Sequence, residues 1–222
     1  MSSLKSAQNG FTGTLVCFAL KEEAVAFRKL ANGKSGISIL LTGIGKANAE
    51  KSLRQFLSGN SPGCVLTSGF AGGLSPELNL GDVVFATEDV KLAETISAAG
   101  ARPAKFFCSS RIATTIGEKQ TLRRDTGADA VEMESAMIHA VCGERHIPCA
   151  TVRAISDTAH ENMPLDFNLL ANADLSLNYG KLAVAIAKSP RKISGLLRLQ
   201  KNCRLAAENV APVLDRVVAR WE

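Results

Sequence analysis

A strand-like run passes directly into a glycine-rich segment in Cys64-Val65-Leu66-Thr67-Ser68-Gly69-Phe70-Ala71-Gly72-Gly73-Leu74. The apolar start predicts a buried strand over Cys64–Thr67. The three glycines then predict a loop over Gly69–Leu74, whose backbone N–H groups approach a flat or sugar ligand closely. An ordinary turn has the same composition, so this segment alone leaves both interpretations open.

Similar strand-like runs recur along the chain, with helical patterns between them. We expect strands at Leu15–Ala19, Ile37–Leu41, Asp82–Ala86 and Cys149–Ile155, and helices at Glu22–Leu30, Lys46–Leu57 and Glu132–Glu144. This alternation predicts an α/β fold with a largely parallel sheet that is covered by helices on both faces. Ligands of such sheets bind at the carboxyl ends of the strands.

Length and composition favour a single globular unit. The 222 residues are 46% hydrophobic and 21% charged, and no apolar run approaches the roughly 20 residues of a membrane span. The polar start of the chain carries no signal-peptide pattern. Six cysteines without a Cys-x-x-Cys pair indicate reduced thiols in a cytoplasmic protein. The three histidines lack metal-ligand spacing, so we expect neither a metal nor another cofactor.

The positive charge is concentrated at the end of the chain. From Lys181 onward there are nine Lys/Arg and three Asp/Glu, a local charge of +6 within a total of +5. The remainder is therefore close to neutral, which argues against nucleic acid as a partner.

Helical patterns dominate this last part of the sequence. They predict a helix over residues 171–187 and, after the break at Ser189-Pro190, two further helices. We therefore expect a main domain at 1–187 and a basic amphipathic helical extension at 188–222. A solvated face that packs on the core is one interpretation of the extension, and a peripheral membrane contact is the other.

Carboxylates gather near predicted strand ends. Glu132 and Glu134 flank a helix start, Asp157 closes an apolar run that also carries Arg153, and Glu23 follows the first strand. Acid–base chemistry needs convergent carboxylates of this kind. Each also has a structural alternative, because acidic residues commonly cap or begin helices.

A second glycine motif lies at Gly43-Ile44-Gly45-Lys46-Ala47-Asn48. It lacks the third glycine of a dinucleotide-binding loop. The Ser or Thr that holds magnesium in a P-loop is also missing after the lysine. A tight strand-to-helix turn is therefore the favoured interpretation.

Taken together, these segments resemble the purine nucleoside/uridine phosphorylase superfamily, and most closely its 5′-methylthioadenosine/S-adenosylhomocysteine nucleosidase branch. The resemblance lies in Ala19-Leu20-Lys21-Glu22-Glu23, Thr42-Gly43-Ile44-Gly45-Lys46, Gly69–Leu74, Gly81-Asp82-Val83-Val84, Val131-Glu132-Met133-Glu134 and Val152-Arg153-Ala154-Ile155-Ser156-Asp157. It implies a three-layer α/β/α phosphorylase/hydrolase-like fold with a central, mostly parallel mixed sheet. It also implies a homodimer that cleaves the N-glycosidic bond of a purine nucleoside.

The resemblance assigns roles residue by residue. Asp157 matches the acid that protonates the leaving base, Glu23 the base that activates water, and Arg153 the partner of that water and of the carboxylates. The residues expected to bind substrate are Glu134 and Met133 at the ribose, Glu132 beside them, Ala71 and Gly72 along the base and ribose, Ser156 next to the acid, and Phe70 and Ile112.

The nucleophile distinguishes two enzyme classes within the superfamily. Phosphorylases of this kind grip phosphate with arginines in the first loop and before the glycine segment, where this chain has none in Ala19–Glu23 or Leu66–Gly69. We therefore expect water rather than phosphate as the nucleophile. The alternatives are a phosphate-dependent phosphorylase, and a catalytically silent nucleoside- or lipid-binding module.

Several features depart from the family pattern. Phe70 replaces a small hydroxyl residue, and the stretch between Asp89 and Glu132 is shorter than in relatives. Phe107 and Ile112 are the candidates for stacking on the base, with a core role as the alternative. The basic tail and the segment from Asp157-Thr158-Ala159 to Pro164-Leu165-Asp166-Phe167 resemble those of hopanoid-associated nucleosidases. The substrate of those enzymes carries adenosine on a lipid, so the resemblance implies a large apolar 5′ substituent.

Overall fold

The computed structural model describes residues 11–172, 174–175 and 178–221, which form one mixed sheet between helices. Six strands lie in the order β2 (Ile37–Leu41), β1 (Thr14–Phe18), β3 (Cys64–Gly73), β8 (Cys149–Asp157), β4 (Val83–Thr87) and β5 (Arg102–Pro103). The first four are mutually parallel, whereas β4 runs antiparallel to β8. The predicted α/β fold with a mostly parallel mixed sheet is therefore confirmed.

Two short strands extend the sheet near the carboxyl end of β3. Strand β7 (Ala130–Glu132) pairs antiparallel with Gly72 and Gly73, and β6 (Phe106–Cys108) runs parallel to β7. The predicted loop over Gly69–Leu74 is wrong for this reason. The glycines continue β3, pairing with β8 through a register shift between Ala71 and Gly72.

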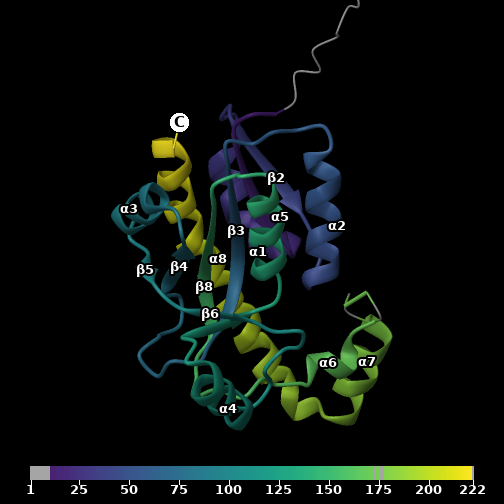
Figure 1. Cartoon of the computed structure of the whole chain (residues 1–222). Coiled ribbons are helices and arrows are strands. Elements are labelled where there is room, and N and C mark those ends of the chain that lie inside the picture. The colour runs from purple at the N-terminus through teal and green to yellow at the C-terminus, as the bar shows by residue number, and fades with distance from the viewer. Residues whose placement is uncertain (1–10, 173, 176–177, 222) are drawn as a thin grey trace, which may run out of the picture.

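Helices cover both faces of the sheet, as Figure 1 shows. On one face α1 (Lys21–Ala31), α3 (Val90–Ala98) and α8 (Ile193–Trp221) bury Phe27, Leu92 and Val210 in one apolar cluster. On the other face α2 (Lys46–Leu57) and α5 (Ser135–Glu144) bury Leu53 and Ile138 in a second cluster. This is the three-layer α/β/α arrangement.

The end of the chain differs from the two helices expected after Pro190. A 3₁₀ turn at Pro190–Lys192 leads into the single helix α8, which continues through Pro212. Its second half carries fully buried apolar side chains such as Val210 and Leu214 against the sheet. Helix α8 therefore packs into the same core as the rest of the chain. The division into a main domain at 1–187 and an extension at 188–222 stays a prediction.

Some helices were missed or misplaced by the sequence pattern. Helix α4 (Ile116–Thr126) and helix α3 fall in a stretch for which no element was expected, and α4 buries Lys119 rather than an apolar residue. The helix expected over 171–187 is confined to α7 (Tyr179–Lys188), after the short α6 (Phe167–Leu170). Residues 173, 176 and 177 of that range lie outside the described residues. No described helix combines the length and apolar character needed to cross a membrane.

Candidate active site

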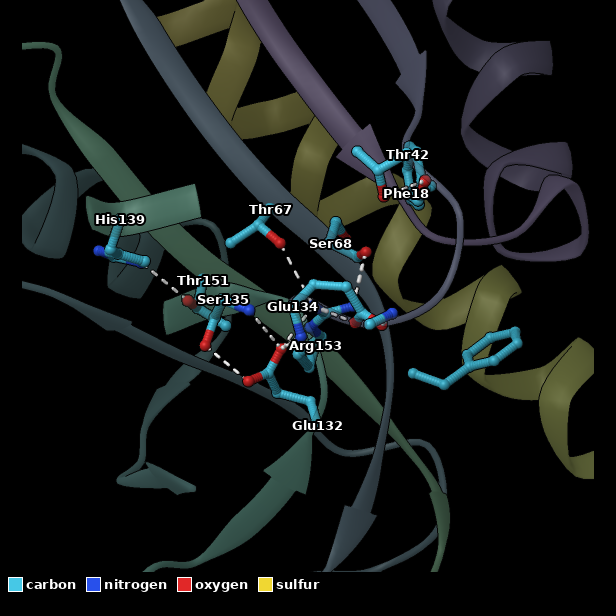
Figure 2. Close-up of polar contacts among 12 residues, drawn as sticks. Phe18, Thr42, Thr67, Ser68, Glu132, Glu134, Ser135, His139, Thr151 and Arg153 are labelled. Atoms are coloured by element: carbon cyan, nitrogen blue, oxygen red, sulfur yellow. Dashed lines mark hydrogen bonds and ion pairs between the residues drawn. The ribbon is translucent and has the colours of Figure 1, made fainter. Parts of the chain in front are cut away.

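Arg153 is the centre of the polar cluster at the middle of β8. It is 1% exposed, because β8 is flanked by strands on both edges and covered on both faces. Its guanidinium donates to the carbonyl of Ser68 at 2.8 Å and to the Thr67 hydroxyl at 3.2 Å. Figure 2 shows these β3 residues on one side of Arg153 and the carboxylates of Glu132 and Glu134 close to it.

Glu132 ends β7, and its carboxylate is buried among protein donors. Its carboxylate accepts from Arg153 Nη2 at 2.8 Å, from the Ser135 hydroxyl at 2.6 Å, and from the N–H groups of Glu134 and Ser135. Burial alone would raise the pKa of Glu132, but Arg153 and these donors outweigh burial, so its pKa lies below the ordinary value. Glu132 therefore anchors Arg153 and the start of α5 as an ionised group.

Glu134 directly precedes α5 and approaches the same nitrogen of Arg153, at 3.2 Å. The two glutamates thus converge on one guanidinium nitrogen. The other Glu134 oxygen accepts from the N–H of Gly45 at 2.8 Å, which comes from the turn before α2. Burial raises the pKa of Glu134, and Arg153 only partly offsets this.

Glu23 lies in the first turn of α1 with its carboxylate pointing toward β3. It accepts from the N–H of Leu20 at 2.9 Å and from that of Phe70 at 2.8 Å. Burial raises the pKa of Glu23 to about 7, against the opposing charge of Arg153. A carboxylate with this pKa can both accept and release a proton near neutral pH, as a general base must.

Gly69 makes the approach of Glu23 to Arg153 possible. Its φ of +135° is rarely adopted by other residues, and a Cβ there would lie 2.3 Å from Glu23 Oε1 and 2.8 Å from Arg153 Nη1. The glycine-rich sequence is therefore needed for close packing of charged side chains, within a strand rather than a loop.

Asp157 is the last residue of β8, and it caps no helix. Its Oδ1 accepts from the Ser156 hydroxyl at 2.8 Å, and its Oδ2 lies 2.6 Å from Lys119 Nζ. Gly72 faces it from β3, where a Cβ would lie 3.2 Å from Asp157 Oδ2. The structure thus brings Ser156, Gly72 and Asp157 together and adds Lys119, which the sequence did not predict.

Arg153 and Asp157 mark the two ends of the candidate site. Three residues lie between them along β8, which corresponds to about 13 Å, and the register shift of β8 against β3 falls in this interval. A cavity of about 20 Å³ adjoins Asp157, lined by residues of the segment after β8 and by Gly195, Arg198, Leu199 and Asn202 of α8. This cavity by itself is too small to hold a purine.

The remaining predicted residues take varied positions. Ala71 is buried on β3, and its carbonyl oxygen lies 3.4 Å from the Ser156 hydroxyl. Met133 and Phe70 are half-buried beside the glutamate cluster. Ile112 is held to α6, where its backbone exchanges two hydrogen bonds with the Asn168 side chain. Phe107 packs partly against an apolar cluster beneath β7, which is the core alternative for that side chain.

Gly45 and Lys119 are among the site residues that the sequence did not predict. Gly45 was assigned only to a turn, although its N–H holds Glu134. Lys119 lies in a helix with no apolar periodicity, so nothing in the sequence distinguishes it from a solvent-exposed lysine. Only the tertiary structure places its ammonium on Asp157.

Comparison of the sequence with known protein families identifies the class of protein to which this fold and site belong. The family model of the Phosphorylase superfamily matches residues 17–113 and 104–188, so the chain belongs to that superfamily. Among relatives, the 5′-methylthioadenosine/S-adenosylhomocysteine nucleosidase of Actinobacillus succinogenes is 33% identical, over 65% of this chain and 77% of the relative. The protein of that name from Glaesserella parasuis is 31% identical, over 65% and 79%.

Solved structures support the fold at lower identity. The 5′-methylthioadenosine/S-adenosylhomocysteine nucleosidase of Neisseria meningitidis, in complex with methylthio-immucillin-A, has a TM-score of 0.71 at 20% identity, over 93% of this chain and 98% of that one. Futalosine hydrolase of Helicobacter pylori has a TM-score of 0.66 at 17% identity, over 92% and 98%.

Proposed function

We propose that the protein hydrolyses the N-glycosidic bond of a purine nucleoside and releases the base from a 5′-substituted ribose. The observation that carries this proposal is the arrangement along β8, where Arg153 at the middle of the strand binds carboxylates and Asp157 ends the strand beside Lys119. The nucleosidase relatives, at 31–33% identity, support the same reaction.

Each end of the site has a distinct role in the proposed reaction. Glu23 takes a proton from water, while Arg153 holds the carboxylates in place. Glu134, with Met133 beside it, receives the ribose hydroxyls. A buried carboxylate there also stabilises the positive charge that develops on the sugar. Asp157, oriented by Ser156, protonates the departing purine.

Water is favoured over phosphate by the charges of the cluster. Arg153 is already paired with Glu132 and Glu134, and Glu23 lies beside it. An incoming phosphate would therefore meet carboxylates rather than a free cation. The test measures base release from adenosine derivatives with and without phosphate, and identifies the sugar product. We expect free sugar in both buffers, whereas strict dependence on phosphate would reject hydrolysis.

The 5′ end of the nucleoside is proposed to point toward α6 and α7. The segment before α7 reaches the ribose side of the site, since the carbonyl of Asp174 accepts from Asn48 and Leu175 packs against Gly45. Helix α7 has no buried residue, and Leu169, Tyr179 and Val184 are more than half exposed. A cavity of about 370 Å³ lies there between Leu169, Val184 and Lys188. We therefore expect bulky apolar 5′ groups to be preferred over methylthio, and the opposite preference would reject this orientation.

A peripheral contact with anionic membranes is proposed for the same surface. Figure 1 places α6 and α7 at the end of the molecule where α8 begins, so the exposed apolar side chains and the cations Lys188, Arg191 and Lys192 lie in one region. Leucines beside cations suit an anionic lipid surface. Vesicles containing anionic phospholipid should bind the protein, and salt should weaken binding.

Substitution tests this contact without removing the buried part of α8. Leu197→Glu combined with Lys188→Glu should abolish vesicle binding, while Lys29→Glu on α1 should leave it intact. Equal binding by both variants would contradict the proposal. The homodimer that the resemblance implies and the cytoplasmic location that the cysteines indicate are also proposals. Sedimentation analysis of the intact chain tests the dimer.

A further inference from the structure

Lys119 is the only fully buried residue of helix α4. It is 0% exposed, and its ammonium lies within hydrogen-bonding distance of three oxygens. These are Asp157 Oδ2 at 2.6 Å, the carbonyl of Thr158 at 2.6 Å and the carbonyl of Glu161 at 3.0 Å. A lysine is almost never fully buried unless it is paired, and here each N–H has an acceptor.

Helix α4 fixes the position of this ammonium. Its first turn is closed by the capping box of Thr115 and Glu118, one residue before Lys119. The Glu118 carboxylate also accepts from the N–H and the hydroxyl of Thr114. Lys119 therefore reaches Asp157 from a well-anchored helix start.

This ion pair conflicts with the simplest form of acid catalysis. An acid that protonates a leaving purine must carry a proton, yet both oxygens of Asp157 accept hydrogen bonds, from Lys119 and from Ser156. In that state Asp157 is a carboxylate, and the proton that the reaction needs is on Lys119.

We propose that Lys119 is the proton reservoir of the leaving-group acid, a positioning residue that acts through Asp157; this rests on the proposed function. When the purine excludes water, a proton moves from Lys119 Nζ to Asp157 Oδ2. The Asp157 O–H then donates it to a ring nitrogen of the purine, while the electrons of the breaking C–N bond pass to the base. Asp157 is again a carboxylate, and Lys119, now a neutral amine, regains its proton from water after release.

Other titratable groups face the pair from the neighbouring elements. The Glu161 carboxylate, in the segment after β8, accepts from the N–H and hydroxyl of Thr158. Arg198, on α8, lines the cavity beside Asp157 and keeps its charge. Cys203, also on α8, has its pKa raised to about 12 by burial and then by the charge of Asp157, so it keeps its proton. The arginine and the thiol therefore do not produce a pH dependence between neutral pH and about pH 9.

The test compares pH profiles of kcat/KM for Lys119→Met, Lys119→Arg and wild type. Two substrates are used: a purine nucleoside and 4-nitrophenyl riboside, whose leaving group departs without protonation. For the purine nucleoside, kcat/KM of Lys119→Met should lie at least about 100-fold below that of wild type near pH 9. The ratio of the variant's kcat/KM to that of wild type should rise toward acid pH, where solution supplies the proton that Lys119 no longer carries. Lys119→Arg should show the same loss, because guanidinium keeps the charge but cannot release a proton.

The controls separate this role from a structural one. Neither variant should lose activity on 4-nitrophenyl riboside at any pH, and Lys105→Met, near the other end of α4, should match wild type on both substrates. A variant-to-wild-type ratio that is independent of pH, equal losses on both substrates, or full activity in Lys119→Arg would overturn the proposal. If Lys119→Met does not fold, Lys119→Arg alone tests whether Lys119 supplies the proton. Failure of wild type to release purine would instead reject the proposed function.

Discussion

At the scale of single residues, the site depends on carboxylates that are buried around one guanidinium. Glu23 and Glu132 both lie close to Arg153, yet their pKa values move in opposite directions. Glu132 receives donors from Ser135 and the start of α5 besides Arg153, whereas burial dominates at Glu23. These opposite pKa shifts give two glutamates different roles. Glu23 can act as a base near neutral pH, whereas Glu132 stays ionised.

The base role of Glu23 predicts the acid side of the pH profile. Because Glu23 must be ionised to accept a proton and its pKa is about 7, wild-type kcat/KM should rise with pH through about 7. Glu23→Gln should lower kcat by about 10²–10⁴-fold. Glu22→Gln, in the same helical turn but exposed, should have no effect. A profile that is already flat at pH 6 would argue against Glu23 as the base.

Glu23 also predicts how stability depends on pH. Its pKa is raised from 4.5 to about 7 on folding, so its protonated form favours the folded state. That contribution is fully present below about pH 4.5 and is lost as pH rises through about 7, and it amounts to about 3 kcal/mol. In urea unfolding, the free energy of unfolding of Glu23→Gln should therefore rise relative to that of wild type between about pH 4 and about pH 8. A constant difference between the two proteins would contradict this.

At the scale of elements, strand β3 shows why the sequence pattern mispredicted part of the secondary structure. Glycine composition predicted a loop, because isolated glycines weaken strands. In the protein, Gly69 and Gly72 stay in the strand since side chains from α1 and β8 occupy the space a Cβ would need. Helix α4 was missed for a related reason. Its inward-facing residue is a lysine, so no apolar period marks it.

Substitution of Gly69 tests this explanation of β3. Gly69→Ala should displace Glu23 and Arg153 and lower kcat/KM by at least about 10-fold, because its φ is +135° and a Cβ would lie 2.3 Å from Glu23 Oε1. Gly59→Ala, at a position with open space and an ordinary φ, is the matched control. Equal activity of the two variants would show that the close approach is unimportant.

Helix α8 gives a second prediction at this scale. Leu214 is 0% exposed in the core, whereas Leu197 on the same helix is 61% exposed. Leu214→Ala should lower the free energy of unfolding by about 2–5 kcal/mol. Leu197→Ala should change it by less than about 0.5 kcal/mol. Urea denaturation measures both, and equal effects would mean that α8 does not form part of the core.

At the scale of the whole molecule, the sequence predicted the layers and most of the residues that gather along β8. Apolar runs identified five strands of the sheet, namely β1, β2, β3, β4 and β8, and the resemblance named Glu23, Arg153 and Asp157 as site residues. Tertiary partners could not be predicted, because Gly45 and Lys119 reach the site from segments 89 and 38 residues away in the chain from Glu134 and Asp157. Long-range contacts of this kind leave no periodic signal in the sequence.

The most direct test of the central claim, that Asp157 protonates the leaving purine, is the ratio of turnover on a purine nucleoside to turnover on 4-nitrophenyl riboside. We expect Asp157→Asn to lower this ratio by about 10²–10⁴-fold, since an amide cannot supply the proton that the purine needs. Activity on the activated riboside should be largely retained. If Asp157→Asn slows both substrates equally, the leaving-group acid lies elsewhere and the account of this site is wrong.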